Sequence, residues 1–186
     1  MHETRPDDRG FTLVEVLVAM LILVSGAMAA AGLFHIAASS TRAALIETQT
    51  AVLAAAKMEQ LLSLVWGYDE AGAPASDLDT DLSVEPVAGG GGGLRSSPVD
   101  TLDRNCPSYV DYLDARGRWV GTGAVPPAQA VYLRRWNIQP LAGFPADALV
   151  LRVRVTTVVQ EALRIRSANP GHGFEASLEA VRMRLY

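Results

Sequence analysis

The chain has 186 residues, enough for one domain of moderate size beside a long helix. Its formal net charge of −4 disfavours broad electrostatic binding to nucleic acid, which requires clustered positive charge. A single cysteine, Cys106, excludes a disulfide within the chain, and the hydrophobic residues, 49% of the total, are concentrated at the N-terminus.

The N-terminal region begins with a short polar leader, residues 1–10, followed by an apolar run from Phe11 to Ala38. About 20 helical residues cross a bilayer core of roughly 30 Å, so residues 11–38 are predicted to span a membrane. The run contains one acid, Glu15, four residues after its start. Because a carboxylate inside a membrane segment is costly, Glu15 is expected to have a function and a partner.

Basic residues on the two sides of this run indicate its orientation. Arg5 and Arg9 precede it, and Arg42 is the first basic residue after it. By the positive-inside tendency, the leader is predicted to be cytoplasmic. Residues 39–186 are then expected outside the cytoplasmic membrane, in the periplasm where the cell has one.

Residues 9–15, Arg-Gly-Phe-Thr-Leu-Val-Glu, resemble the prepilin-peptidase recognition site of type IV pilins and their relatives. The resemblance implies cleavage after Gly10, N-methylation of the new terminal Phe11, and a role for Glu15 in subunit assembly. It also implies three kinds of partner: prepilin peptidase, other major and minor pilins bound through the N-terminal helix, and the inner membrane.

Two other interpretations of the N-terminus remain. The run resembles an ordinary signal anchor whose Glu15 reaches the head groups. Residues 27–29, Ala-Met-Ala, offer a small-x-small site for cleavage of a secretory signal peptide. The leader disfavours a signal peptide, because its acids outnumber its arginines.

Helix-forming residues continue beyond the apolar run. Residues 39–66 contain no proline or glycine, so one helix is predicted from Thr12 to Trp66, about 80 Å long at the standard rise, with Gly67 ending it. An apolar stripe in its second half predicts packing against a core, and its members are Ile46, Leu53, Ala54, Met58, Leu61, Leu64 and Val65. The opposite side carries Arg42, Gln49, Gln60 and Ser63.

The next segment, residues 68–101, is rich in Gly, Pro, Ser and Asp and contains the run Gly89–Gly93, which predicts a flexible linker or surface loop. Asp77, Asp79 and Asp81 alternate like the first ligands of a calcium loop. However, Leu82 stands where that loop needs glycine, and its last acid is missing. We interpret the segment as a solvated acidic loop, and predict no metal and no cofactor.

Alternating apolar and polar residues predict strands in the last third of the chain. Strands are expected at residues 131–138, 149–159 and 178–185, with a hairpin around 109–120 that turns at 114–117. In the last strand, Leu178, Val181, Met183 and Leu185 are grouped against Arg182 and Arg184. A small antiparallel sheet packed on the amphipathic half of a long helix makes an α+β fold. The resemblance implies the same layout, the lollipop of pilins, whose helix has a transmembrane half and an amphipathic half.

Arginines recur in the strand region, at Arg152, Arg154, Arg182 and Arg184, with Arg134 and Arg135 nearby. The first four would line one face of adjacent strands, and this basic face would suit a polyanion such as DNA, or an acidic neighbouring subunit. We favour a solvated outer face, so nucleic acid is an unsupported partner.

Signals of catalysis are weak, and the chain is not predicted to be an enzyme. His2, His35 and His172 lie far apart and show no metal-ligand spacing. Cys106, beside Pro107, is interpreted as a buried or idle thiol unless it pairs with another chain.

The resemblance indicates a more specific function. Residues 11–20 and 57–61 are most similar to PilV-type pilus-modification minor pilins, with minor pseudopilins of type II secretion as the nearest alternative. A membrane-tethered periplasmic binding module is a third interpretation of the function. The expected segments are a prepilin leader (1–10), a transmembrane assembly half of the helix (11–38) and a periplasmic pilin-like domain (39–186).

Overall fold

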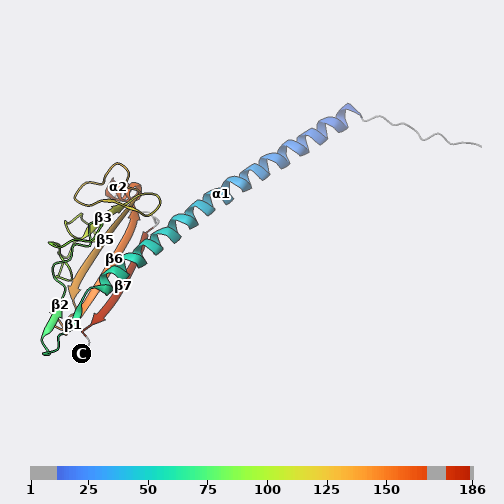
Figure 1. Ribbon diagram of the computed structural model, residues 1–186. Coiled ribbons are helices and arrows are strands. Elements are labelled where there is room, and N and C mark those ends of the chain that lie inside the picture. Colours follow the sequence, from blue (N-terminus) through green and yellow to red (C-terminus); the bar gives the residue numbers. More distant parts are fainter. Residues whose placement is uncertain (1–11, 167–174, 185–186) are drawn as a thin grey trace, which may run out of the picture. The chain divides into compact units, whose positions relative to one another are not determined.

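The computed structural model describes residues 12–166 and 175–184 (Figure 1). Its elements in chain order are α1 (Leu13–Ser63), β1 (Trp66–Tyr68), β2 (Pro74–Ser76), β3 (Val110–Leu113), β4 (Trp119–Gly121), β5 (Tyr132–Pro140), β6 (Ala148–Thr157), α2 (Val158–Arg166) and β7 (Glu175–Met183). The chain divides into two compact units, residues 1–44 and 45–186. The first contains the N-terminal part of α1, and the second contains the rest of α1 and every strand.

The predicted long helix is present as α1, which ends three residues before the expected Trp66. Within the second unit, Leu53, Ala54, Met58 and Leu61 of the predicted stripe are buried, and Leu64 follows the helix in the same core. Val65 was placed wrongly in the stripe, because the helix has ended and its side chain is 58% exposed. Gly67 lies in β1 and does not terminate the helix.

The strands form an antiparallel five-stranded sheet of order β4-β3-β5-β6-β7 and a two-stranded sheet of β1 and β2. The three long strands predicted from alternation are present, with shifted ends. The expected hairpin is β3 and β4, and Gly117 makes the turn with φ of 76°. Asp114 holds this turn by accepting bonds from the backbone of Arg116 and Arg118. The fold class is therefore α+β, as predicted.

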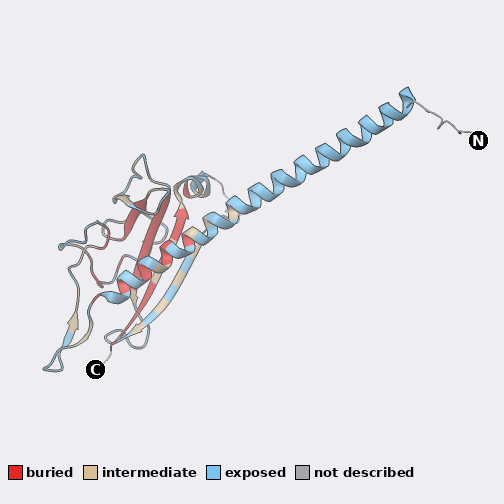
Figure 2. Cartoon of the chain, turned by 45° about the vertical axis from the view of Figure 1, so that its right-hand side comes forward, coloured by how far each residue is buried: buried red, intermediate tan, exposed pale blue. Residues whose placement is uncertain are grey.

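One face of the five-stranded sheet packs against the second half of α1 to form the core (Figure 2). Trp136 of β5 pairs with Val153 of β6, which pairs with Leu178 of β7, so all three side chains point to this face. The alternation within β7 was predicted wrongly. Val181 was grouped with Leu178, but an odd spacing puts it on the opposite face, where its side chain is 54% exposed.

Helix α2 was not predicted, because the expected strand over residues 149–159 runs past the point where β6 ends and α2 begins. Strand β6 ends at Thr157, whose Oγ1 accepts a bond of 3.2 Å from the backbone N–H of Gln160. A Thr followed three residues later by Gln is a capping-box pattern, so the sequence contained the signal for this helix start.

Two alternatives were predicted for residues 68–101, a flexible linker or a surface loop, and the structure supports the surface loop. The segment includes β2, which pairs with β1, and its Leu82 and Leu94 are buried in the core. A Cβ on Gly91 would clash with Asp81 Cα, so the glycine allows two backbone segments to pack closely. These glycines serve close packing in an ordered loop.

Candidate processing and assembly site

The predicted processing junction, Gly10 and Phe11, lies outside the described residues. The structure begins at Thr12, whose Oγ1 accepts a bond of 3.3 Å from the backbone N–H of Glu15. Thr12 therefore caps α1, and Glu15 stands at the third helical position, as in a capping box. Its carboxylate lies in the first turn, where the helix dipole favours negative charge. Local structure thus stabilises an acid at this position.

The segment that follows Glu15 has the composition of a membrane span. Its most apolar window of 18 residues has a mean hydropathy of 2.4, and none of that window is buried within the protein. Figure 2 shows this part of α1 as exposed throughout. Ser25 Oγ donates 2.7 Å to the carbonyl of Leu21. A hydroxyl group bonded to its own helix is compatible with lipid.

Glu15 borders a shallow hollow on this helix, together with Val16, Ala19, Met20 and Leu23. Ala19 has the smallest side chain of the five, and it lies four residues from both Glu15 and Leu23, so these three share one face. Glu15 is the only charged residue in this lining. A partner that fits this face would offer apolar side chains and one positive group beside them.

The second unit holds a buried charge cluster that the sequence reasoning missed. Lys57 Nζ lies 2.9 Å from Asp111 Oδ2, donates 2.7 Å to the carbonyl of Leu82, and lies 4.4 Å from the ring centre of Trp136. Arg134 donates to both oxygens of Asp111, at 2.8 and 2.7 Å. Burial lowers the pKa of Lys57 to about 8, against the attraction of Asp111. Lys57 falls between Leu53 and Leu61 at helical spacing, and a lysine within an apolar stripe was the available signal.

The predicted single face of arginines is wrong. Arg152 and Arg154 project from the far face of the sheet and pair with Glu179 and with Asp103 and Glu175. Arg134 and Arg135 are buried and bind Asp111 and Glu161. A solvated outer face therefore describes only part of the set, and no continuous basic surface forms from these six residues.

Two of the arginines bind backbone carbonyls at the end of α1 and in the β1–β2 sheet. Arg182 points to the helix side of β7, where its guanidinium donates 3.0 Å to the carbonyl of Leu61 and 2.5 Å to that of Leu64. It thus satisfies carbonyls at the end of α1. Arg184 stacks 3.7 Å from the ring centre of Trp66 and donates to the carbonyls of Gly67 and Ala75. Their role is structural.

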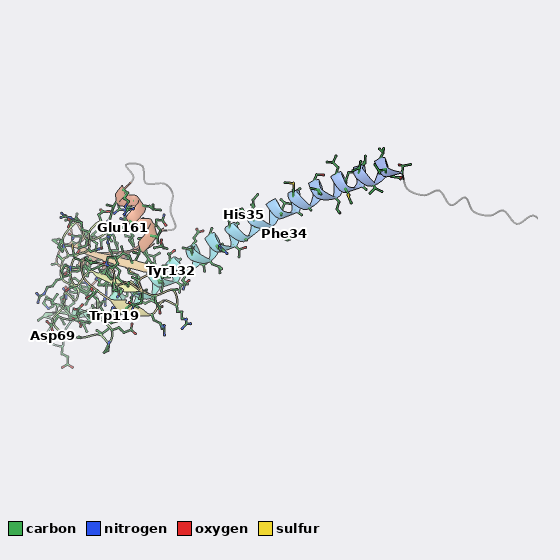
Figure 3. The ribbon with its side chains drawn as sticks, turned by 90° about the horizontal axis from the view of Figure 1, so that it is seen from above. Phe34, His35, Asp69, Trp119, Tyr132 and Glu161 are labelled. Carbon is green, nitrogen blue, oxygen red and sulfur yellow. The ribbon has the colours of Figure 1, made fainter. Side chains whose placement is uncertain are left out.

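The acidic loop uses its carboxylates for its own turns. Asp77 accepts bonds from the backbone and hydroxyl of Thr80, which lower the pKa of Asp77, and Asp81 accepts from the backbone and hydroxyl of Ser83. Among residues 12–166 and 175–184, no three His, Cys, Asp or Glu side chains gather as metal ligands. His35 is exposed on α1 (Figure 3), Cys106 is partly buried against the core, and His172 lies outside the described residues.

Comparison with known proteins identifies the N-terminal segment. Residues 5–31 match the family model described as the prokaryotic N-terminal methylation motif. The match covers the second part of the leader with Gly10, and then Phe11 and Glu15, and it supports a type IV pilin-like or pseudopilin protein that prepilin peptidase processes. No curated protein and no solved structure matches the chain. The second unit therefore has to be interpreted from its own residues.

Proposed function

We propose that this chain is a minor pilin of the PilV type, cut by prepilin peptidase between Gly10 and Phe11 and incorporated into, or initiating, a type IV pilus. The observation that carries the proposal is the methylation-motif match over residues 5–31. The mature protein begins with an N-methylated Phe11, its apolar helix holds it in the inner membrane, and residues 39–186 fold in the periplasm.

Glu15 has an assembly role in this proposal. Cleavage creates an ammonium on Phe11, four residues before Glu15 and about 6 Å from it along a helix. A side chain on a helix projects sideways, so the ammonium of a neighbouring subunit at a staggered height is the natural partner. In a medium of low dielectric, such a pair is strong when formed and costly when broken. The hollow beside Ala19 offers apolar contact next to this charge.

The packed second unit supports a structural role. Its conspicuous charges, Lys57, Asp111 and Arg134, are buried and bind one another, so they join α1 to β3 and β5. Such a unit presents a fixed surface, as a filament subunit requires. A minor pseudopilin of type II secretion would use the same N-terminal chemistry, and genetic neighbours distinguish the two machines.

The mature N-terminus tests this function. We expect cells with prepilin peptidase to yield a chain that begins with methylated Phe11, by mass spectrometry of the N-terminal peptide. Gly10→Val should leave the full-length precursor in the membrane. Gly32→Val is the matched control, because no heavy atom lies within 4 Å of the Cβ that it would add, and it should be cleaved normally. Equal processing of Gly10→Val and wild type would contradict the proposal.

A further inference from the structure

Helix α2 lies at one particular end of the second unit. The backbone N–H of Val158 donates 2.9 Å to the carbonyl of Val131, and Glu161 accepts a bond of 2.8 Å from Arg135 of β5. At the same end, the hydroxyl of Tyr132 donates 2.9 Å to Gln49 of α1. Figure 3 places Glu161 and Tyr132 toward this end of the unit and Asp69 toward the other. Helix α2 is therefore at the end where α1 enters the unit.

The outward side of α2 is apolar, and the described residues of its unit leave it exposed. Val159, Ala162, Leu163 and Arg166 are spaced as one helical face, opposite the buried Glu161. Val159 is 72% exposed and Leu163 is 58% exposed, and Ile165 near the end of the helix is 74% exposed. Exposed aliphatic side chains followed by an arginine are the composition of a helix that lies in a membrane interface.

Chain length keeps this end of the unit close to the membrane. Leu45, where the second unit begins, lies seven positions after Ala38, at the end of the apolar run. Seven residue steps reach about 10 Å as a helix and no more than roughly 25 Å when fully extended. This limit needs no assumption about the angle between the two units. The closeness to the membrane rests on the membrane span of the proposed function.

We propose that α2 is a membrane-contact helix, whose Val159–Leu163 face enters the head-group region of the bilayer in which α1 is anchored. Arg166 then lies at the level of the lipid phosphates. A helix of nine residues binds lipid weakly by itself. Here the anchor supplies a high effective concentration, so weak contacts are sufficient to hold the unit on the bilayer. The contact would orient the subunit before its assembly and would be broken when the subunit leaves the membrane.

Lipid-dependent quenching on the full chain tests this contact. In a Cys106→Ala background, an environment-sensitive dye is attached at Leu163→Cys, and the chain is reconstituted in vesicles of phosphatidylethanolamine and phosphatidylglycerol that contain a nitroxide lipid. Phe144→Cys is the matched control. Phe144 is 60% exposed against 58% for Leu163, and its loop joins β5 to β6 at the opposite end of the sheet. We expect quenching at position 163 to exceed that at 144 several-fold, and Val159→Asp to remove the difference.

Other outcomes overturn the proposal in distinguishable ways. Equal quenching at both positions, in a chain that stays in the vesicles after alkaline extraction, rejects the α2 contact alone. Loss of the chain from the vesicles rejects the span, and with it both the proposed function and this inference. A dye signal at 163 that follows protein density and not the nitroxide lipid would assign the face to a second copy of the chain.

Discussion

Lys57 on α1 and Asp111 on β3 form a buried ion pair of 2.9 Å, with each side chain 1% exposed. Arg134 shares the same carboxylate, so two cations face one anion in the core. The cluster joins three elements far apart in sequence. The stability that a mutation costs therefore depends on which of the three charged side chains it removes.

Asp111→Asn should be far more destabilising than Lys57→Met. The first change leaves two buried cations without a counter-ion, a situation that costs about 3–5 kcal/mol. The second leaves the balanced pair of Asp111 and Arg134, and it should change the free energy of unfolding by less than about 1.5 kcal/mol. Urea denaturation followed by tryptophan fluorescence measures both, since Trp136 lies beside Lys57. Equal losses of stability in the two variants would mean that two buried cations without a counter-ion do not destabilise the fold.

Stability should rise with pH between about 8 and 10. The pKa of Lys57 is lowered from 10.5 to about 8 by burial, so in this range the folded chain has released a proton that the unfolded chain still holds. The gain is about 2 kcal/mol at roughly 1.4 kcal/mol per pH unit. Burial raises the pKa of Tyr109, Tyr112 and Tyr132 above 10.0. The unfolded tyrosines therefore ionise first above pH 10, and stability should fall there.

The variant Lys57→Met provides the control for this pH dependence. It keeps all three tyrosines and removes the titrating amine. Its free energy of unfolding should stay nearly constant from pH 8 to 10 and then fall as in wild type. A rise of the same size in this variant would assign the pH effect to another group.

A fragment that begins at Ser39 should be a soluble, folded monomer, because the sheet supplies the partner for the apolar stripe of α1. Within it, Leu61→Ala should cost about 2–5 kcal/mol, since Leu61 is fully buried. Leu62→Ala is the control on the adjacent residue, which is 41% exposed, and should cost less than about 1 kcal/mol. Thermal unfolding of the two variants measures the difference. Similar losses of stability would mean that α1 turns a different face toward the sheet.

Periodicity was sufficient to predict much of the second unit. The helix, its stripe around Leu53 and Leu61, and the three long strands follow from spacings of 3.6 and 2 residues. The core-facing positions of β7 were predicted wrongly because Arg182, a residue expected at the surface, faces α1 and binds the carbonyls at the end of that helix. Tertiary contacts of this kind leave no periodic signal. Lys57 also departs from the pattern, because its charge is satisfied by residues distant in sequence.

Composition was misleading in two places. The glycines of residues 89–93 suggested flexibility, whereas Gly91 and Gly93 allow backbones to approach in an ordered loop. Helix α2 was not predicted because β-branched residues precede and begin it, and because the helix cap formed by Thr157 and Gln160 was not recognised.

The motif around Gly10 and Glu15 could be predicted from the sequence, because processing depends on local residues at fixed spacing.

The distribution of Glu15 variants between membrane and filament tests the central claim most directly. Glu15→Ala should be cleaved, inserted and folded, but depleted from sheared filaments by at least about tenfold, as loss of one strong ion pair predicts. Glu15→Asp should be intermediate, because the charge remains while its reach shortens. Val18→Ala, close to Glu15 but outside the lining of its hollow, should assemble nearly as wild type. Quantitative immunoblots of both fractions measure these ratios, and normal incorporation of Glu15→Ala would contradict an assembly role for Glu15.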